Sequence, residues 1–60
     1  MTAAEMLDRL SKYRSSMTKQ DALDYDNLVK KLKIGDVRYH DMRLLECLHV
    51  EYIGSLGLAA

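Results

Sequence analysis

The chain has 60 residues, one cysteine, and nine basic against nine acidic side chains, so its formal net charge at neutral pH is zero. A length of 60 residues leaves room for one domain, and a single cysteine excludes an intramolecular disulfide. The balanced charge is also unlike that of most nucleic-acid-binding proteins, which carry a basic excess.

The composition is typical of an all-α fold, because proline is absent and residues that favour helices are frequent. The sequence predicts three short helices, over about residues 3–14, 19–33 and 37–53, packed as a small helical bundle. We expect one domain over residues 1–60, with a flexible tail over residues 55–60. A lone cysteine, and no apolar run that suits a secretory leader or a membrane span, indicate a cytoplasmic protein without a membrane partner.

The first predicted helix begins with a capping box. Thr2 and Glu5 have the T-x-x-E spacing, in which each side chain accepts a hydrogen bond from a free backbone amide at the helix start. Apolar side chains recur at helical spacing in the residues that follow: Met6, Leu7, Leu10 and Tyr13. Ser15 and Ser16 then favour a break, because serine competes for backbone hydrogen bonds inside a helix.

The second predicted helix has signals at both ends. Thr18 is its candidate N-cap. Aspartates occupy its first half and lysines its last turns, which is the distribution that the helix dipole favours. Gly35 follows as a candidate left-handed C-cap, because glycine adopts positive φ without a steric penalty.

The third predicted helix follows after a short connection, with Asp36 as its expected N-cap. Such a connection indicates an antiparallel neighbour or a tight helix-turn-helix corner. On a helical wheel its apolar residues point in nearly every direction, and a helix that is hydrophobic all round is typically buried. Most of them form one broad stripe with its flank, whereas Tyr39 and Val50 fall nearly opposite: Val37, Met42, Leu44, Leu45, Leu48, Tyr52 and Ile53.

Two other short helices are too few to surround the third, and a 60-residue chain has little core of its own. The sequence therefore predicts a homodimer. The alternative is that Tyr39 and Val50 are ordinary exposed apolar residues, which are common on protein surfaces. The residues expected to meet a second copy or a target protein are Tyr39, Met42, Val50, Tyr52 and Ile53.

No catalytic constellation is recognisable, so we expect no enzymatic activity, no cofactor and no metal. His40 and Cys47 share one helical stripe, but a structural zinc site needs more ligands than this chain offers. Cys47 and His49 are two residues apart and point away from each other on a helix. We expect His49 to be a hydrogen-bonded histidine of the core or of an interface.

A basic cluster lies where the second helix meets the third, and this geometry suits an approach to a nucleic-acid groove. Asp36 and Asp41 oppose that interpretation, because they would face the phosphates. The residues of this cluster are Lys30, Lys31, Lys33, Arg38 and Arg43. The preferred hypothesis is a small interaction protein, a regulator, inhibitor or adaptor that binds and modulates another protein. The alternative is a small dimeric transcriptional regulator that binds nucleic acid through the basic cluster.

The last three residues, Leu58, Ala59 and Ala60, resemble the end of the bacterial trans-translation degradation tag, which AAA+ proteases recognise through the terminal carboxylate. The resemblance implies a bacterial or phage protein with a short lifetime, as suits a regulator. The alternative is a tail of small residues without a signal.

Overall fold

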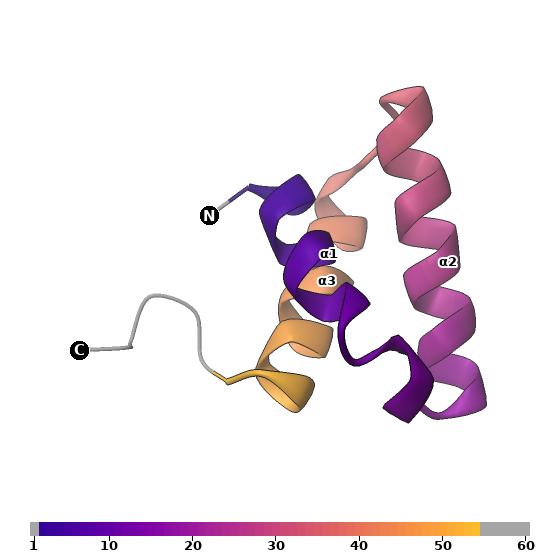
Figure 1. Ribbon diagram of the computed structural model, residues 1–60. Coiled ribbons are helices and arrows are strands. Elements are labelled where there is room, and N and C mark those ends of the chain that lie inside the picture. The colour runs from indigo at the N-terminus through magenta and orange to yellow at the C-terminus, as the bar shows by residue number, and fades with distance from the viewer. Residues whose placement is uncertain (1, 55–60) are drawn as a thin grey trace.

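The computed structural model describes residues 2–54, which form three α-helices and one short 3₁₀ helix (Figure 1). In chain order the elements are α1 (Ala3–Ser11), η1 (Arg14–Ser16), α2 (Lys19–Ile34) and α3 (Tyr39–Tyr52). The prediction of a small three-helix fold is confirmed. The predicted tail and the candidate degradation signal at Leu58, Ala59 and Ala60 lie outside the described residues.

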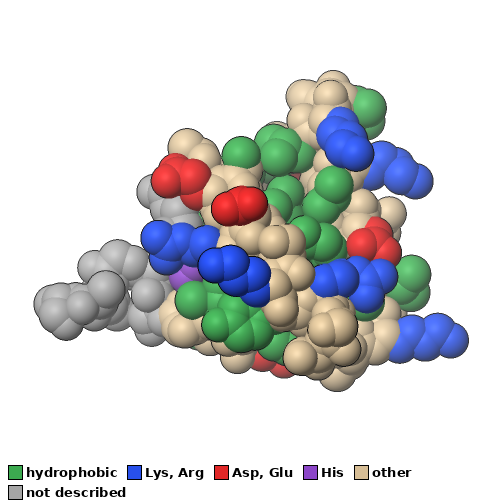
Figure 2. Space-filling model, viewed as in Figure 1, with side chains coloured by type: hydrophobic (Ala, Val, Ile, Leu, Met, Phe, Trp, Pro, Cys, Tyr) green, Lys and Arg blue, Asp and Glu red, His purple; other side chains and the backbone are tan. Residues whose placement is uncertain are grey.

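The helix α1 crosses in front of α3, and α2 stands beside both (Figure 1). The core is built from leucines and one methionine, and all three helices contribute: Met6, Leu7, Leu10, Leu28, Leu45 and Leu48. Partly buried apolar side chains from all three helices pack against this core. On the face with α1 in front, hydrophobic side chains follow the seam between α1 and α2, with Lys and Arg side chains around them (Figure 2). In residues 2–54, no helix has both the length and the apolar character that a membrane span requires.

The predicted caps of α1 and α2 are confirmed. The Glu5 carboxylate accepts a hydrogen bond from the Thr2 amide at 3.0 Å, and the Thr2 hydroxyl accepts one from the Glu5 amide at 3.2 Å. The Thr18 hydroxyl accepts a hydrogen bond from the Asp21 amide at 3.2 Å, a contact whose loss typically costs about 1 kcal/mol. Gly35 ends α2 with φ of 70°, the left-handed conformation that favours glycine.

The end of α1 differs from the prediction, which extended the helix to residue 14. The helix ends at Ser11, whose hydroxyl donates to the Asp8 carbonyl at 2.6 Å and so occupies a helical acceptor. The chain then turns through η1, where the Arg14 guanidinium donates to both carboxylate oxygens of Asp26 at 3.1 and 2.9 Å. This bidentate pair joins η1 to α2.

The start of α3 also differs from the prediction. The helix begins at Tyr39 rather than at residue 37, and Asp36 is not its cap. Arg38 occupies the N-cap position, and its backbone amide donates to the Asp41 carboxylate at 3.0 Å. Asp36 instead accepts a hydrogen bond from the Arg38 guanidinium at 3.2 Å. The acid at the third helical position therefore starts the helix, as in the second half of a capping box.

Candidate functional site

The outward face of α3 is the candidate interaction surface. Leu45 and Leu48 are buried in the core, so the opposite side of the helix faces away from it. Tyr39 is 79% exposed and Val50 is 51% exposed on that side. They lie about three helical turns apart, and Arg43 and Glu46 occupy the turns between them. We call these four residues the outward stripe: Tyr39, Arg43, Glu46 and Val50.

The outward stripe combines apolar ends with a polar centre. The Arg43 guanidinium lies 3.9 Å from the Glu46 carboxylate, and both side chains are substantially exposed. An ion pair of this length at the surface contributes little to stability, because water screens it. Cys47 is exposed next to the stripe. The two charges therefore remain available to a second partner.

The other three residues of the predicted interface lie against the protein's own core. Met42, Tyr52 and Ile53 are partly buried and pack on the core cluster. The Tyr52 hydroxyl donates to the Asp21 carboxylate at 2.6 Å and accepts from the Thr18 amide at 3.3 Å. The hydrogen bond to Asp21 raises the pKa of the Tyr52 phenol. The two hydrogen bonds of Tyr52 hold the end of α3 against the start of α2, and so help to orient the outward stripe.

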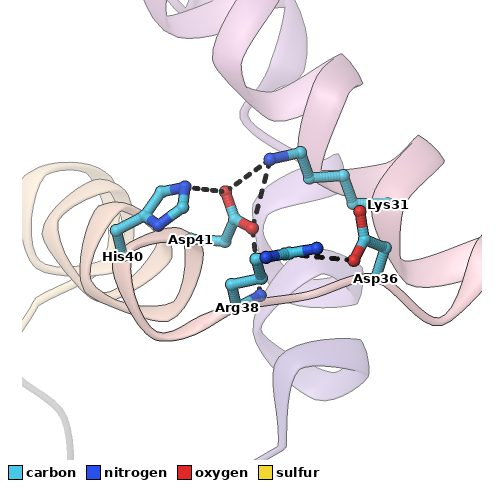
Figure 3. A network of polar contacts seen from close by, with 5 residues as sticks. All are labelled: Lys31, Asp36, Arg38, His40 and Asp41. Carbon is cyan, nitrogen blue, oxygen red and sulfur yellow. Dashed lines mark hydrogen bonds and ion pairs between the residues drawn. The ribbon is translucent and has the colours of Figure 1, made fainter.

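A polar network at the start of α3 has the same orienting effect (Figure 3). Asp41 is only 5% exposed. Besides the Arg38 amide, it accepts hydrogen bonds from the Lys31 ammonium at 2.9 and 3.2 Å, and His40 lies 3.4 Å away. The hydrogen bond from the Arg38 amide, which has the largest effect, and the hydrogen bond from Lys31 hold the pKa of Asp41 below its ordinary value. The network ties the first turn of α3 to the last turn of α2.

Asp41 was expected from the sequence to face the phosphates of a bound nucleic acid, which requires an exposed carboxylate, and this was wrong. Two local signals could have identified it. Position 41 lies on the same side of the helical wheel as Leu45 and Leu48, which are buried. It also lies three residues after Arg38, at the spacing at which an acidic side chain reaches back to an N-cap amide.

The predicted basic cluster does not form an unopposed basic surface. Lys31 pairs with Asp41, and Arg38 pairs with Asp36 at 3.2 Å. Arg43 lies near Glu46, as described above, while Lys30 and Lys33 are exposed. A carboxylate beside a cation competes with phosphate for that cation, so the cluster is poorly suited to nucleic acid.

A groove of about 330 Å³ lies between α2 and α3. It is lined by Asp24, Asn27, Leu28, Lys31, Asp41 and Leu44. Leu44 and Asp41 lie more than a quarter turn around α3 from the outward stripe, as the helical spacing requires. The groove and the stripe are therefore separate surfaces.

His49 is a buried, hydrogen-bonded histidine, in agreement with the prediction for this residue. It is 2% exposed, and its Nδ1 lies 2.9 Å from the Gly54 carbonyl oxygen. That carbonyl can only accept, so Nδ1 carries the proton in this contact. The other ring nitrogen is buried and has no hydrogen-bond partner among residues 2–54. Cys47 is exposed whereas His49 is buried, so the two side chains do not meet.

Comparison of the chain with protein-family models, with curated proteins and with solved structures finds no match. The functional inference consequently rests on the chemistry and exposure of the surfaces described above.

Proposed function

We propose that this protein is a small helical interaction protein that acts as a homodimer and binds and modulates another protein, as a regulator, inhibitor or adaptor. The observation that supports the proposal is the outward stripe of α3, with Tyr39 79% exposed and Val50 51% exposed on one face of a helix that the core holds in place. Aromatic residues are enriched in protein interfaces, where a rigid ring supplies a large contact area.

Burial of Tyr39 by a partner supplies a substantial driving force. An aromatic side chain carries roughly 150–250 Å² of accessible area, and four-fifths of that is open here. At about 25 cal/mol per Å², complete burial of this side chain corresponds to about 3–5 kcal/mol. Val50 adds a smaller contribution of the same kind, so two side chains account for an appreciable part of a micromolar affinity.

Electrostatics also favour a protein partner over nucleic acid. The chain has no net charge, and three of the five cations of the predicted basic cluster have carboxylate neighbours. The outward stripe likewise contains one charge of each sign. A surface of this kind complements another mixed protein surface better than a phosphate backbone.

An affinity pulldown from native lysate tests the proposal, with wild type compared with a double variant, Tyr39→Ala plus Val50→Asp. The matched control is Leu23→Ala plus Ile34→Asp, which makes the same kinds of change at two exposed apolar residues of α2 with the same spacing. We expect the α3 variant to lose the polypeptides that wild type captures and the α2 variant to retain them. Capture that is equal for all three proteins, with all three folded by circular dichroism, would refute the assignment of the surface.

A salt titration with random duplex DNA tests the nucleic-acid alternative. Binding driven by released counterions weakens steeply as the salt concentration rises. We expect no binding at physiological salt. Submicromolar binding that disappears with added salt, and that depends on Lys30 and Lys33, would replace the protein-interaction proposal.

A further inference from the structure

We infer that the partner on the outward stripe is a second copy of this chain, with the two α3 helices packed antiparallel about a two-fold axis that passes between residues 44 and 45. This inference rests on the proposed function and specifies the geometry of its homodimer. The spacing of the four stripe residues along the helix and their charges support this arrangement.

The stripe is symmetric in position. Tyr39 and Val50 lie at equal distances on either side of the point between residues 44 and 45, and so do Arg43 and Glu46. In two antiparallel helices related by a two-fold axis at that point, Tyr39 lies level with Val50 of the second copy. Arg43 lies level with Glu46 of the second copy. A two-fold interface requires such self-complementarity, because each contact occurs twice.

The charges are complementary in this register. Each arginine lies near its own Glu46 and near Glu46 of the second copy, so four charges form a ring with two of each sign. The existing Arg43–Glu46 pair is long, at 3.9 Å, and exposed, so a second carboxylate can engage the guanidinium without breaking a strong contact. The aromatic ring of Tyr39 covers Val50 of the second copy at each end, which removes apolar area from water.

The exposed face of α2 lacks this property, although it has a similar outline. Leu23 and Ile34 are exposed there with the same spacing as Tyr39 and Val50. The corresponding central positions hold Asn27 and Lys30. Antiparallel pairing of α2 in the same register would place each Lys30 level with Asn27 of the second copy rather than with an acid, and would bring two like charges together, which is unfavourable. The self-complementary pattern belongs to α3.

The size of the contact sets its strength. The 14 residues of α3 are about 21 Å long, and one helix pair of that length buries less than the roughly 1,200–2,000 Å² of a standard stable interface. We therefore expect a dimer with a dissociation constant in the micromolar range. The groove that contains Leu44 lies elsewhere on α3 and remains accessible in this arrangement.

The native Cys47 provides a test of the register without a new cysteine, because it is exposed beside the stripe. For antiparallel helices about 8–10 Å apart in this register, the two Cys47 side chains lie about 10 Å from each other on the same side of the contact. A short bismaleimide whose reach matches that separation should convert wild type to a covalent dimer at protein concentrations above the dissociation constant. Cys47→Ser is the control and should give none.

Charge reversal tests the pairing itself. We expect Arg43→Glu alone and Glu46→Arg alone each to weaken self-association roughly tenfold or more, because like charges then face each other across the axis. An equimolar mixture of these two variants should associate again, since each position then meets the opposite charge. Analytical ultracentrifugation of the single variants and of the mixture measures this. Recovery on mixing shows that these two positions meet across the interface between two chains, and the Cys47 cross-link then tests the register.

Three results would overturn the inference. The first is wild type that remains monomeric up to millimolar concentration, and this result would also remove the homodimer from the proposed function. The second is a wild-type dimer that the bismaleimide does not link through Cys47, and the third is a mixture of the two charge variants that fails to associate. In each case the binding of another protein is judged separately by the pulldown, because stripe-dependent capture does not require this dimer. Loss of both the dimer and the stripe-dependent capture would reject the inference and the proposed function together.

Discussion

Two adjacent leucines of α3 provide a sharp test of how this helix is rotated against the core. Leu45 is completely buried, whereas Leu44 is 37% exposed and borders the groove between α2 and α3. The substitutions Leu45→Ala and Leu44→Ala remove the same atoms from neighbouring positions. Helix propensity changes equally in both variants, so a difference between them reports on packing alone.

The expected magnitudes are well separated. Replacement of a fully buried leucine by alanine costs about 2–5 kcal/mol, because both the transfer free energy and the contacts around the new cavity are lost. Leu44 is already partly in water and leaves no closed cavity, so we expect a loss of about 1 kcal/mol. A 60-residue chain has a total free energy of unfolding of only about 3–9 kcal/mol. Leu45→Ala therefore removes a large part of the stability, and Leu44→Ala does not.

Urea unfolding followed by circular dichroism at low micromolar protein concentration measures both losses, since self-association contributes little under these conditions. Leu23→Ala is a further control, because Leu23 is 52% exposed on α2 and its replacement should cost less than about 0.5 kcal/mol. Equal losses for Leu44→Ala and Leu45→Ala would refute the orientation of α3, and with it the outward direction of the stripe.

Three further predictions concern the ends of the helices. Gly35→Ala should cost about 1 kcal/mol and lower the melting temperature by roughly 4–8 °C: an added Cβ meets nothing within 4 Å, but φ of 70° is unfavourable for alanine. An unchanged melting temperature would contradict it. Asp41 has a lowered pKa in the fold, so its carboxylate stabilises the protein above its ordinary pKa of about 4, and this contribution is lost as the pH falls through the lower, folded value. The difference in unfolding free energy between wild type and Asp41→Asn should therefore shrink when urea unfolding is repeated in that acidic range, and a difference that stays constant would exclude the proposed role. The pKa of Tyr52 is raised by its hydrogen bond to Asp21, so the neutral phenol stabilises the fold below its ordinary pKa of about 10, and this is lost as the pH rises through the higher, folded value. The difference between the alkaline absorbance titration curves of wild type and Tyr52→Phe should show one phenol that ionises at a higher pH than free tyrosine. Ionisation at the pH of free tyrosine would argue against the hydrogen bond to Asp21.

The sequence alone determined the local features of this protein. Thr2 with Glu5, Thr18, and Gly35 are signals that act within one turn of backbone, and each lies where it was predicted. The helical wheel of the third helix was also correct, because a period of about 3.6 residues depends only on the backbone. It separated Tyr39 and Val50 from the apolar majority, and both are exposed.

The end of α1 and the start of α3 were predicted wrongly for the same kind of reason. At each place one side chain could form either of two local hydrogen-bonding patterns. Ser11 and Asp36 could each have been helical or cap residues by their type. The Ser11 hydroxyl donates to a carbonyl one turn back, and Asp36 pairs with the Arg38 side chain. Small differences in hydrogen bonding select between such alternatives, so residue type alone does not predict the outcome.

Only the tertiary structure decided which side of each helix faces the core and which charges meet between helices. Met42, Tyr52 and Ile53 were grouped with the interface by their chemistry, and the structure shows that all three pack against the core of the same chain. The bonds of Asp41 to Lys31, and of Tyr52 to Asp21, join residues that are distant in the chain. Helical periodicity says which residues share a face but not what that face meets, because the partner of a face is set by packing among all three helices.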